Sequence, residues 1–177
     1  MVAPRYARAG HPGLLFAEDA AAVERAAPLV EAAGLTPGDP LPDAPPASAG
    51  LEIRVVDNPG TLRVYNATLA TAFGPPRAWL AIFDDPATLR LPDFVFSPGT
   101  LDGAPGATAM RHTSHRVGEV CNVATLPEYR RCGDGTALTW RAAVDGRAEG
   151  CLASALQPST EGFLVYARMG YRCVADY

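Results

Sequence analysis

The sequence predicts an α+β domain over residues 51–177, preceded by an N-terminal extension over residues 1–50. From Leu51 onward, segments with strand-like alternation are interleaved with segments of helical spacing. Between residues 119 and 140, an apolar strand leads through a polar turn containing Gly133 and Gly135 into the start of a helix. Mixed elements in a chain of 177 residues are typical of one globular domain of this class.

The N-terminal extension differs in composition from the rest of the chain. Helical spacing over Glu18–Gly34 predicts one helix, and Pro28 inside it predicts a kink. The segment Thr36–Gly50 carries five prolines, which is typical of an extended linker. We therefore expect the folded domain to begin near Leu51.

Three strands and two helices are expected between Leu51 and Arg116, before the strand that leads into the glycine-containing turn. In chain order they are a strand over Leu51–Val56, a helix over Leu62–Phe73, a second helix over Pro76–Leu89 that Pro86 interrupts, and strands over Phe94–Ser97 and Gly106–Arg116. The prolines and glycines at Asn58–Gly60 and at Leu101–Gly106 mark the turns. After the turn we expect a helix over Thr136–Glu149, a strand over Cys151–Leu156 and a final helix within Ser159–Tyr171.

The strand, turn and helix around Gly133 predict an anion site. Such a turn directs unpaired backbone N–H groups and the positive end of a helix dipole to one point, where a phosphate binds most often. The site is not a Walker loop, because all 15 basic residues are arginines and the chain has no lysine. The same absence excludes a pyridoxal-phosphate Schiff base. The dinucleotide fingerprint is not met either, since Leu138 stands where its third small residue belongs.

Composition and charge restrict the partners and the location. A net charge of −4 argues against nucleic-acid binding by bulk electrostatics. We expect no membrane partner and a cytoplasmic protein, because there is neither an apolar stretch of membrane-spanning length nor a signal peptide. The four cysteines lack the spacing of a zinc site, so we expect no metal and reduced thiols with packing roles.

Two motifs in order resemble those of the GNAT superfamily of acetyl-CoA-dependent N-acetyltransferases. Arg130-x-x-Gly133-x-Gly135 is similar to their pyrophosphate loop, and Tyr166-x-x-x-Gly170-Tyr171 is similar to the end of their last helix. The resemblance implies a layered α/β/α fold with a mixed, mainly antiparallel sheet and splayed central strands. It also implies transfer of an acetyl group from acetyl-CoA to a primary amine of a small molecule or peptide. A homodimer is compatible with it.

The same resemblance assigns the residues that hold acetyl-CoA. Its pyrophosphate is expected on the turn and its pantetheine arm along the end of the preceding strand, where the Val123 amide would polarise the thioester carbonyl. The residues concerned are Val123, Ala124, Thr125, Arg130, Arg131, Gly133, Asp134, Gly135 and Thr136. Asp134 departs from the family pattern, in which this middle position is usually apolar. A carboxylate beside a pyrophosphate is repelled by it unless the carboxylate points away.

Two residues are expected to move protons. Tyr166 is the candidate acid for the departing thiolate, and a local environment could close the gap of about 1.5 between the reference pKa values of tyrosine and a thiol. Glu119, 11 residues before Arg130, is the candidate base for the amine. On strand alternation, Glu119 shares a face with Cys121 and Val123. His112, His115, Glu128 and a chain of water molecules are alternative bases.

Two other function classes are compatible with the sequence. If Asp134 weakens binding, the domain is an inactive acyl-CoA sensor or an interaction module of the same fold. The third class is an α+β structural protein without a ligand. Binding of acetyl-CoA and turnover on amines distinguish the three.

Overall fold

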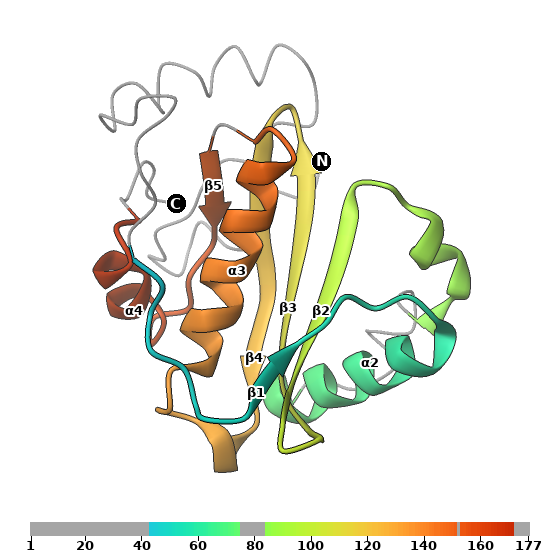
Figure 1. Cartoon of the computed structure of the whole chain (residues 1–177), viewed down its shortest axis with the longest axis horizontal. Helices are drawn as coiled ribbons and strands as arrows, with labels where there is room; N and C mark the ends of the chain where they lie inside the picture. The colour runs from blue at the N-terminus through green and yellow to red at the C-terminus, as the bar shows by residue number, and fades with distance from the viewer. Residues whose placement is uncertain (1–42, 75–83, 152, 172–177) are drawn as a thin grey trace.

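A computed structural model describes residues 43–74, 84–151 and 153–171 of the chain, which contain one five-stranded sheet in the order β1-β2-β3-β4-β5 (Figure 1). The strands are β1 (Leu51–Ile53), β2 (Phe94–Leu101), β3 (Ala104–Ser114), β4 (Val117–Thr125) and β5 (Ala153–Leu156). Strands β1 to β4 pair antiparallel, and β5 pairs parallel to β4. The expected mixed, mainly antiparallel sheet is confirmed.

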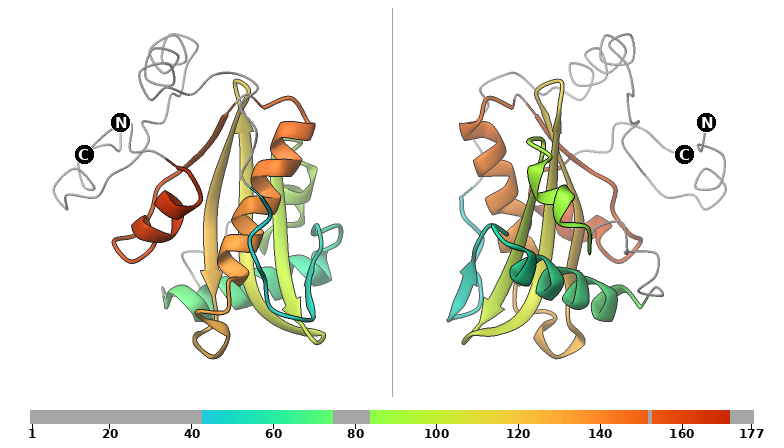
Figure 2. Two further views of the ribbon diagram at one scale, coloured as in Figure 1. Left: turned by 60° about the vertical axis from the view of Figure 1, so that its left-hand side comes forward. Right: turned by 90° about the vertical axis from the view of Figure 1, so that its right-hand side faces the viewer.

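Helices cover both faces of this sheet, with α2 on one side and α3 on the other (Figure 2). The α-helices are α2 (Pro59–Phe73), α3 (Asp134–Ala148) and α4 (Phe163–Arg168), and two short 3₁₀ helices are η2 (Pro86–Arg90) and η3 (Pro127–Tyr129). The predicted three-layered α/β/α arrangement is therefore confirmed.

Helix α2 has capping residues at both ends. The Asn58 side chain accepts hydrogen bonds from the amides of Gly60 and Thr61, with Pro59 in the first turn. At the other end, Gly74 adopts a left-handed conformation with φ 73° and donates its amide to Ala70. Because Asn58 caps it, the helix begins three residues before the predicted start at Leu62.

The two faces of the sheet pack differently. On one face, Leu62, Tyr65 and Leu69 of α2 pack with Phe96 and Met110. On the other face, the small side chains of β3 let α3 approach closely. That contact consists of Ala107, Ala109 and Leu138, with a neighbouring cluster of Val120, Ala142 and Leu156.

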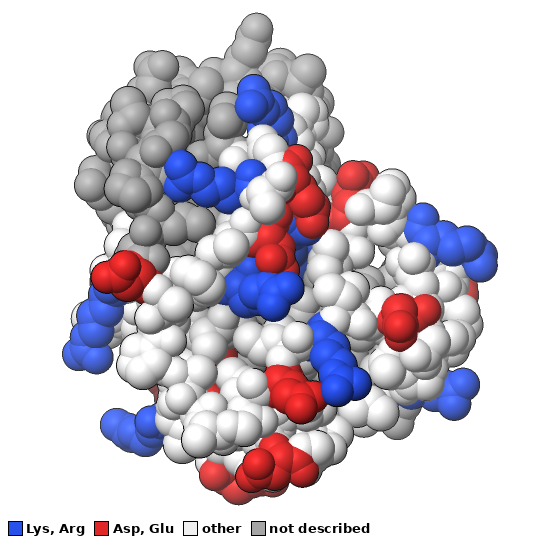
Figure 3. All heavy atoms as spheres, in the orientation of Figure 1, with Lys and Arg blue, Asp and Glu red and all other residues white. Residues whose placement is uncertain are grey.

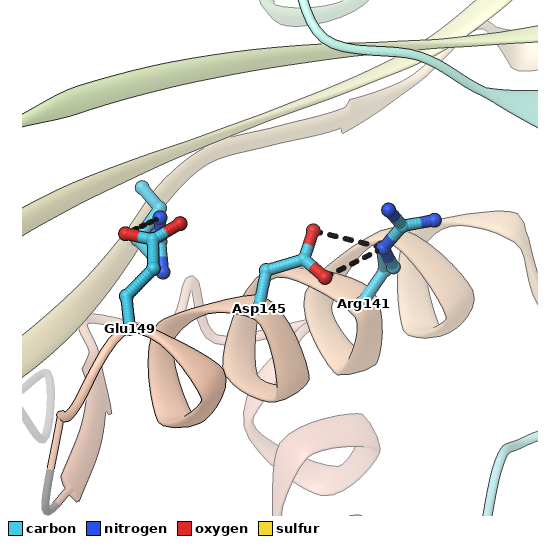
Figure 4. A network of polar contacts seen from close by, with 4 residues as sticks. Arg141, Asp145 and Glu149 are labelled. Atoms are coloured by element: carbon cyan, nitrogen blue, oxygen red, sulfur yellow. Dashed lines mark hydrogen bonds and ion pairs between the residues drawn. The ribbon is translucent and has the colours of Figure 1, made fainter.

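A buried arginine ties the end of α3 to the sheet. Arg111 of β3 is 2% exposed, and its Nη2 lies 2.6 Å from Glu149 Oε2 (Figure 4). A Cβ at Gly146 would lie 2.9 Å from Arg111 Nη1, so glycine makes room for the guanidinium. On the exposed side of the helix, Arg141 Nε contacts both carboxylate oxygens of Asp145 at 2.8 Å. Arg111 therefore fixes the orientation of α3 on the sheet.

The β2–β3 hairpin differs from the sequence prediction. Strand β2 continues through Pro98 to Leu101 rather than ending at Ser97, and the turn is confined to Asp102 and Gly103, with φ 49° and 82°. The Pro98 carbonyl still accepts a hydrogen bond from the Arg54 amide, and the β2–β3 ladder is irregular at the next residue, which is a position where the missing N–H of proline is tolerated. The predicted end of this strand at Ser97 was therefore wrong.

Other boundaries shifted by a few residues. Strand β1 ends at Ile53 instead of Val56, and α4 covers only Phe163–Arg168 of the predicted final helix. Of the predicted helix over 76–89, residues 76–83 lie outside the described part, and residues 86–89 belong to η2. The predicted helix within 18–34 lies outside it as well. None of the described helices is long and apolar enough to cross a membrane.

Candidate active site

A cleft opens where β4 and β5 separate. Their pairing runs from Val117 with Ala153 to Val120 with Leu156, where β5 ends while β4 continues to Thr125. The cleft has a volume of about 960 Å³ and is lined by residues 122–125 of β4, residues 157–162 after β5, and the first turn of α3. The predicted splay of the central strands is thus present in the sheet.

A β-bulge in β4 shapes the wall of the cleft. Met110 pairs with Cys121 and Thr108 with Ala124, so β4 has one extra residue, and Asn122 adopts φ 52°. The Thr108 hydroxyl donates to the Asn122 carbonyl at 2.9 Å. Val123 has no register partner in either β3 or β5.

The bulge corrects one sequence expectation. Cys121 packs with the α2 face of the sheet, whereas Val123 packs with the clusters on the α3 face. Simple alternation placed Val123 on the same face as Glu119 and Cys121, which is wrong, because the inserted residue reverses the alternation after Asn122.

The start of α3 presents backbone donors to the cleft. Its N-cap is Gly133, with φ 95°, and no side chain of the described residues caps it. Ala137 is the first helix residue whose amide bonds back to Gly133, which leaves the preceding amides outside the helical ladder. Gly135 and Thr136 line the cleft, so their position agrees with the expected anion site.

The two arginines of the turn differ in role. Arg130 lines the cleft, and it donates from Nε to the Thr125 carbonyl at 3.1 Å and from Nη2 to the Ala72 carbonyl at 3.2 Å. It therefore joins the end of β4 to the end of α2. Arg131 is exposed with φ 67° and is absent from the wall of the cleft.

Asp134 points away from the cleft. It is 1% exposed, does not line the cleft, and its Oδ1 accepts a hydrogen bond from the Ser48 amide at 3.1 Å. Gly133 also faces this segment, since a Cβ there would lie 2.5 Å from the Pro46 carbonyl oxygen. The sequence left open whether the Asp134 carboxylate points away from the expected anion site or weakens binding there. In the structure the carboxylate points away.

Tyr166 of α4 lies between the cleft and a smaller pocket of about 190 Å³, and it lines both. Its ring packs edge-on to Tyr171 with centroids 6.1 Å apart, and close to Gly162. Burial raises the pKa of Tyr166, and interaction with the Thr139 side chain opposes that shift. The environment therefore widens the difference between the pKa of Tyr166 and that of a thiol, whereas the sequence argument allowed the environment to close this difference.

Glu119 lines the smaller pocket together with Tyr166. Its side chain is 16% exposed, and burial raises the pKa of Glu119 from 4.5 to about 7. A carboxyl with this pKa changes protonation near neutral pH, as a general base requires. Burial and the nearby Glu119 carboxylate also raise the pKa of Cys121 to about 12, so this thiol stays protonated.

The candidate bases differ in whether they line a cavity. His112 is the cross-strand partner of Glu119, with its Nδ1 3.7 Å from Oε2, and its ring stacks on Phe94. His115 lies in the β3–β4 turn, where its Nδ1 contacts the Ser114 hydroxyl at 2.7 Å. Glu128 lies in η3. Only Glu119 among these four lines either cavity.

Sequence reasoning missed several residues of the two cavities. Asn122, Gln157 and Ser159 line both of them. An asparagine in a strand is a signal for a bulge, because asparagine tolerates positive φ better than most residues. Phe73, which helical spacing left open between the core and an amine pocket, lines both cavities from the end of α2.

The surface charge is mixed. On the face shown in Figure 3, arginine and acidic side chains are interspersed over a largely uncharged surface. Among the described residues, no group of three or more His, Cys, Asp and Glu side chains is arranged to hold a metal ion. Within the same residues Cys121, Cys132 and Cys151 are free thiols, and Cys173 lies outside them.

Comparison with known families decides the assignment. The model of the Acetyltransferase (GNAT) family matches residues 58–171, which include the splayed strands, the turn at Gly133 and Tyr166. The chain belongs to the GNAT acetyltransferase family. The resemblance that the two motifs indicated is confirmed, and the described domain is an acetyltransferase of this family.

Solved structures with the same fold include several acetyltransferases. A GCN5-related N-acetyltransferase from Kribbella flavida is 29% identical with a TM-score of 0.57, and the match covers 79% of this chain and 52% of that one. An acetyltransferase of Trypanosoma brucei is 24% identical with a TM-score of 0.55, covering 69% and 92%. AAC(6')-Iy in complex with a CoA bisubstrate analog is 18% identical with a TM-score of 0.61, covering 72% and 94%. No curated protein matches the chain.

Proposed function

We propose that this GNAT protein transfers an acetyl group from acetyl-CoA to a primary amine by direct attack. The observation that carries the proposal is the cleft between β4 and β5, which ends at the uncapped start of α3. Free backbone N–H groups at a helix N-terminus suit a pyrophosphate, and unpaired strand backbone suits the amide groups of a pantetheine arm. A volume of about 960 Å³ lies at the upper end of the range of small-molecule sites.

The residues of the cleft fit acetyl-CoA, which supplies an activated thioester when bound. The amides of Gly135 and Thr136 would hold the pyrophosphate, and Val123 to Thr125 would pair with the pantetheine arm. Arg131, Gly133 and Asp134 do not line the cleft, so we assign them to the conformation of the turn. The Val123 amide, which has no register partner, would donate to the thioester oxygen as negative charge develops there.

Two side chains would handle the protons. Glu119 would take the proton from the attacking ammonium group, and the amine nitrogen would then form a bond to the acetyl carbon while the carbon–sulfur bond breaks. Tyr166 would donate its hydroxyl proton to the sulfur that leaves. A raised pKa keeps this hydroxyl protonated at neutral pH, so it is available as a donor. As the amide forms, the nitrogen loses a second proton, which returns to Tyr166 through solvent. Glu119 releases the first proton to solvent, so one proton is released for each acetyl group transferred.

The acceptor belongs to the class of cationic amines. The smaller pocket adjoins the cleft at Tyr166, and Glu119 is the acidic residue in its lining. A cationic amine suits such a pocket because Coulomb attraction favours the ion pair and places its nitrogen beside the base. Amine acceptors also occur among relatives with this fold, such as glucosamine-6-phosphate N-acetyltransferase from Arabidopsis thaliana.

Thiol release from acetyl-CoA, measured against a panel of amines, tests this function. We expect turnover with at least one amine, and we expect Tyr166→Phe to lower kcat about 100-fold. Tyr129→Phe is the matched control, because Tyr129 in η3 lines neither cavity. Tight acetyl-CoA binding without turnover on any amine would favour the acyl-CoA sensor. Absence of binding would contradict both functions.

A further inference from the structure

A short segment braces the turn that leads into α3. Pro46–Ser48, called the brace segment, contacts Gly133 and Asp134, neither of which lines the cleft. The contact joins residues that are 86 positions apart in the sequence. It therefore connects the part of the chain before the sheet directly to the turn beside the cleft.

Two separate contacts form this connection. The Ser48 amide donates to Asp134 Oδ1 at 3.1 Å, in an environment where Asp134 is 1% exposed. The Pro46 carbonyl oxygen packs so close to Gly133 that a Cβ would lie 2.5 Å from it. The second contact excludes every side chain at position 133, which already needs a left-handed φ of 95°.

The brace segment is itself fixed to the sheet. The Ser48 carbonyl accepts a hydrogen bond from the Leu51 amide at 3.2 Å, and Leu51 begins β1, which pairs with β2. A chain of contacts thus runs from the edge of the sheet through Ser48 to Asp134. Asp134 is the first residue of α3 and immediately precedes Gly135, which lines the cleft.

We propose that Asp134 is a positioning residue that, through Ser48, holds the first amides of α3 in the orientation that binds the pyrophosphate of the acyl donor. This inference rests on the proposed function. An acidic residue in this turn would ordinarily repel a phosphate, but here its carboxylate is used as an internal hydrogen-bond acceptor. Among the described residues, Asp134 Oδ2 has no hydrogen-bond partner, so the bond from Ser48 is the contact that orients the carboxylate.

Three variants separate the positioning effect from the effect of charge. Asp134→Asn removes the negative charge but keeps an oxygen that can accept from the Ser48 amide. Asp134→Ala removes both. Ser48→Pro removes the donor and leaves the turn unchanged. Ala44→Pro is the control, because it adds a proline just before the brace segment, at an exposed position preceding Pro45 where extended backbone is favoured.

The first measurement needs no ligand. Amide hydrogen exchange of residues 131–137 in the free protein should accelerate about fivefold or more in Asp134→Ala and in Ser48→Pro, which is the scale of losing one helix-capping hydrogen bond. Exchange in Asp134→Asn and in Ala44→Pro should match the wild type. Unchanged exchange in both Asp134→Ala and Ser48→Pro would overturn the inference, whether or not the protein binds acetyl-CoA.

Calorimetric titration with acetyl-CoA gives the second measurement. We expect the Kd to rise about fivefold in Asp134→Ala and in Ser48→Pro, and to be equal to or lower than the wild-type value in Asp134→Asn. Equal tightening in Asp134→Asn and Asp134→Ala would mean that the charge alone matters, which overturns the positioning role. If the wild type binds no acetyl-CoA, the proposed function fails, and the exchange measurement still decides whether the brace orders the turn.

Discussion

Replacement of Glu119 by glutamine is expected to stabilise the protein above neutral pH while it removes activity. The carboxyl is largely buried, and its pKa rises from 4.5 to about 7 because burial disfavours the charged form. The folded protein therefore binds the proton more tightly than the unfolded chain does. In the wild type, the contribution of Glu119 to the free energy of unfolding should therefore fall as the pH rises from about 4.5 to about 7 and should then level off.

The size of this effect follows from the pKa values. A rise from 4.5 to about 7 corresponds to at most about 3.4 kcal/mol, at 1.36 kcal/mol per pKa unit. Water reaches the open pocket and screens the charge, so we expect roughly half of this free energy, or about 2 kcal/mol. For a protein of this size, that difference amounts to about 4–8 °C in Tm.

Thermal unfolding of the wild type and Glu119→Gln between pH 4 and pH 8 measures this difference. The two Tm values should nearly coincide at pH 4 and separate as the pH rises, with the variant more stable at pH 8. Glu128→Gln, an exposed carboxylate in η3, is the control and should follow the wild type throughout. A Tm difference between wild type and Glu119→Gln that does not change with pH would refute the assignment of a buried, raised-pKa carboxyl.

Four further predictions concern the turn and the sheet. Gly133→Ala should lower the Tm strongly, because of its φ of 95° and the Pro46 carbonyl oxygen, as unfolding by heat would show. Gly135→Ala should leave the free energy of unfolding unchanged or raise it by up to about 1 kcal/mol, because a Cβ at this position would have ordinary contacts, the nearest at 3.4 Å. The same variant should weaken acetyl-CoA binding in calorimetry, because it places a methyl group beside the pyrophosphate. Arg111→Ala should cost about 2–5 kcal/mol in denaturant unfolding because it empties buried space, and Arg111→Met should cost much less because Met refills that space without a charge. Arg130→Met should raise the KM for acetyl-CoA more than it lowers kcat, because the side chain joins two walls of the cleft. Equal losses for the two glycine variants, or for the two Arg111 variants, would contradict these assignments.

The sequence predicted the elements of the cleft better than their details. Alternation and glycine spacing located β4, the turn and α3, because these signals are local. The bulge at Asn122 could not be read from alternation, because it depends on how β4 pairs with β3. The reversal of Val123 to the other face of the sheet followed from it.

The orientation of Asp134 was beyond the reach of sequence reasoning for a similar reason. Its hydrogen-bond partner, Ser48, lies 86 residues earlier in a segment that the prolines predicted to be a linker. Long-range contacts of this kind leave no periodic signal. The pKa of Glu119 likewise depends on burial, which only the packed structure reveals.

A crystal structure of the protein with bound CoA tests the central claim most directly. We predict that the pyrophosphate accepts hydrogen bonds from the amides of Gly135 and Thr136, and that the sulfur lies beside the Tyr166 hydroxyl. Asp134 should still accept from Ser48. CoA bound outside the cleft between β4 and β5, or with its sulfur remote from Tyr166, would contradict the account.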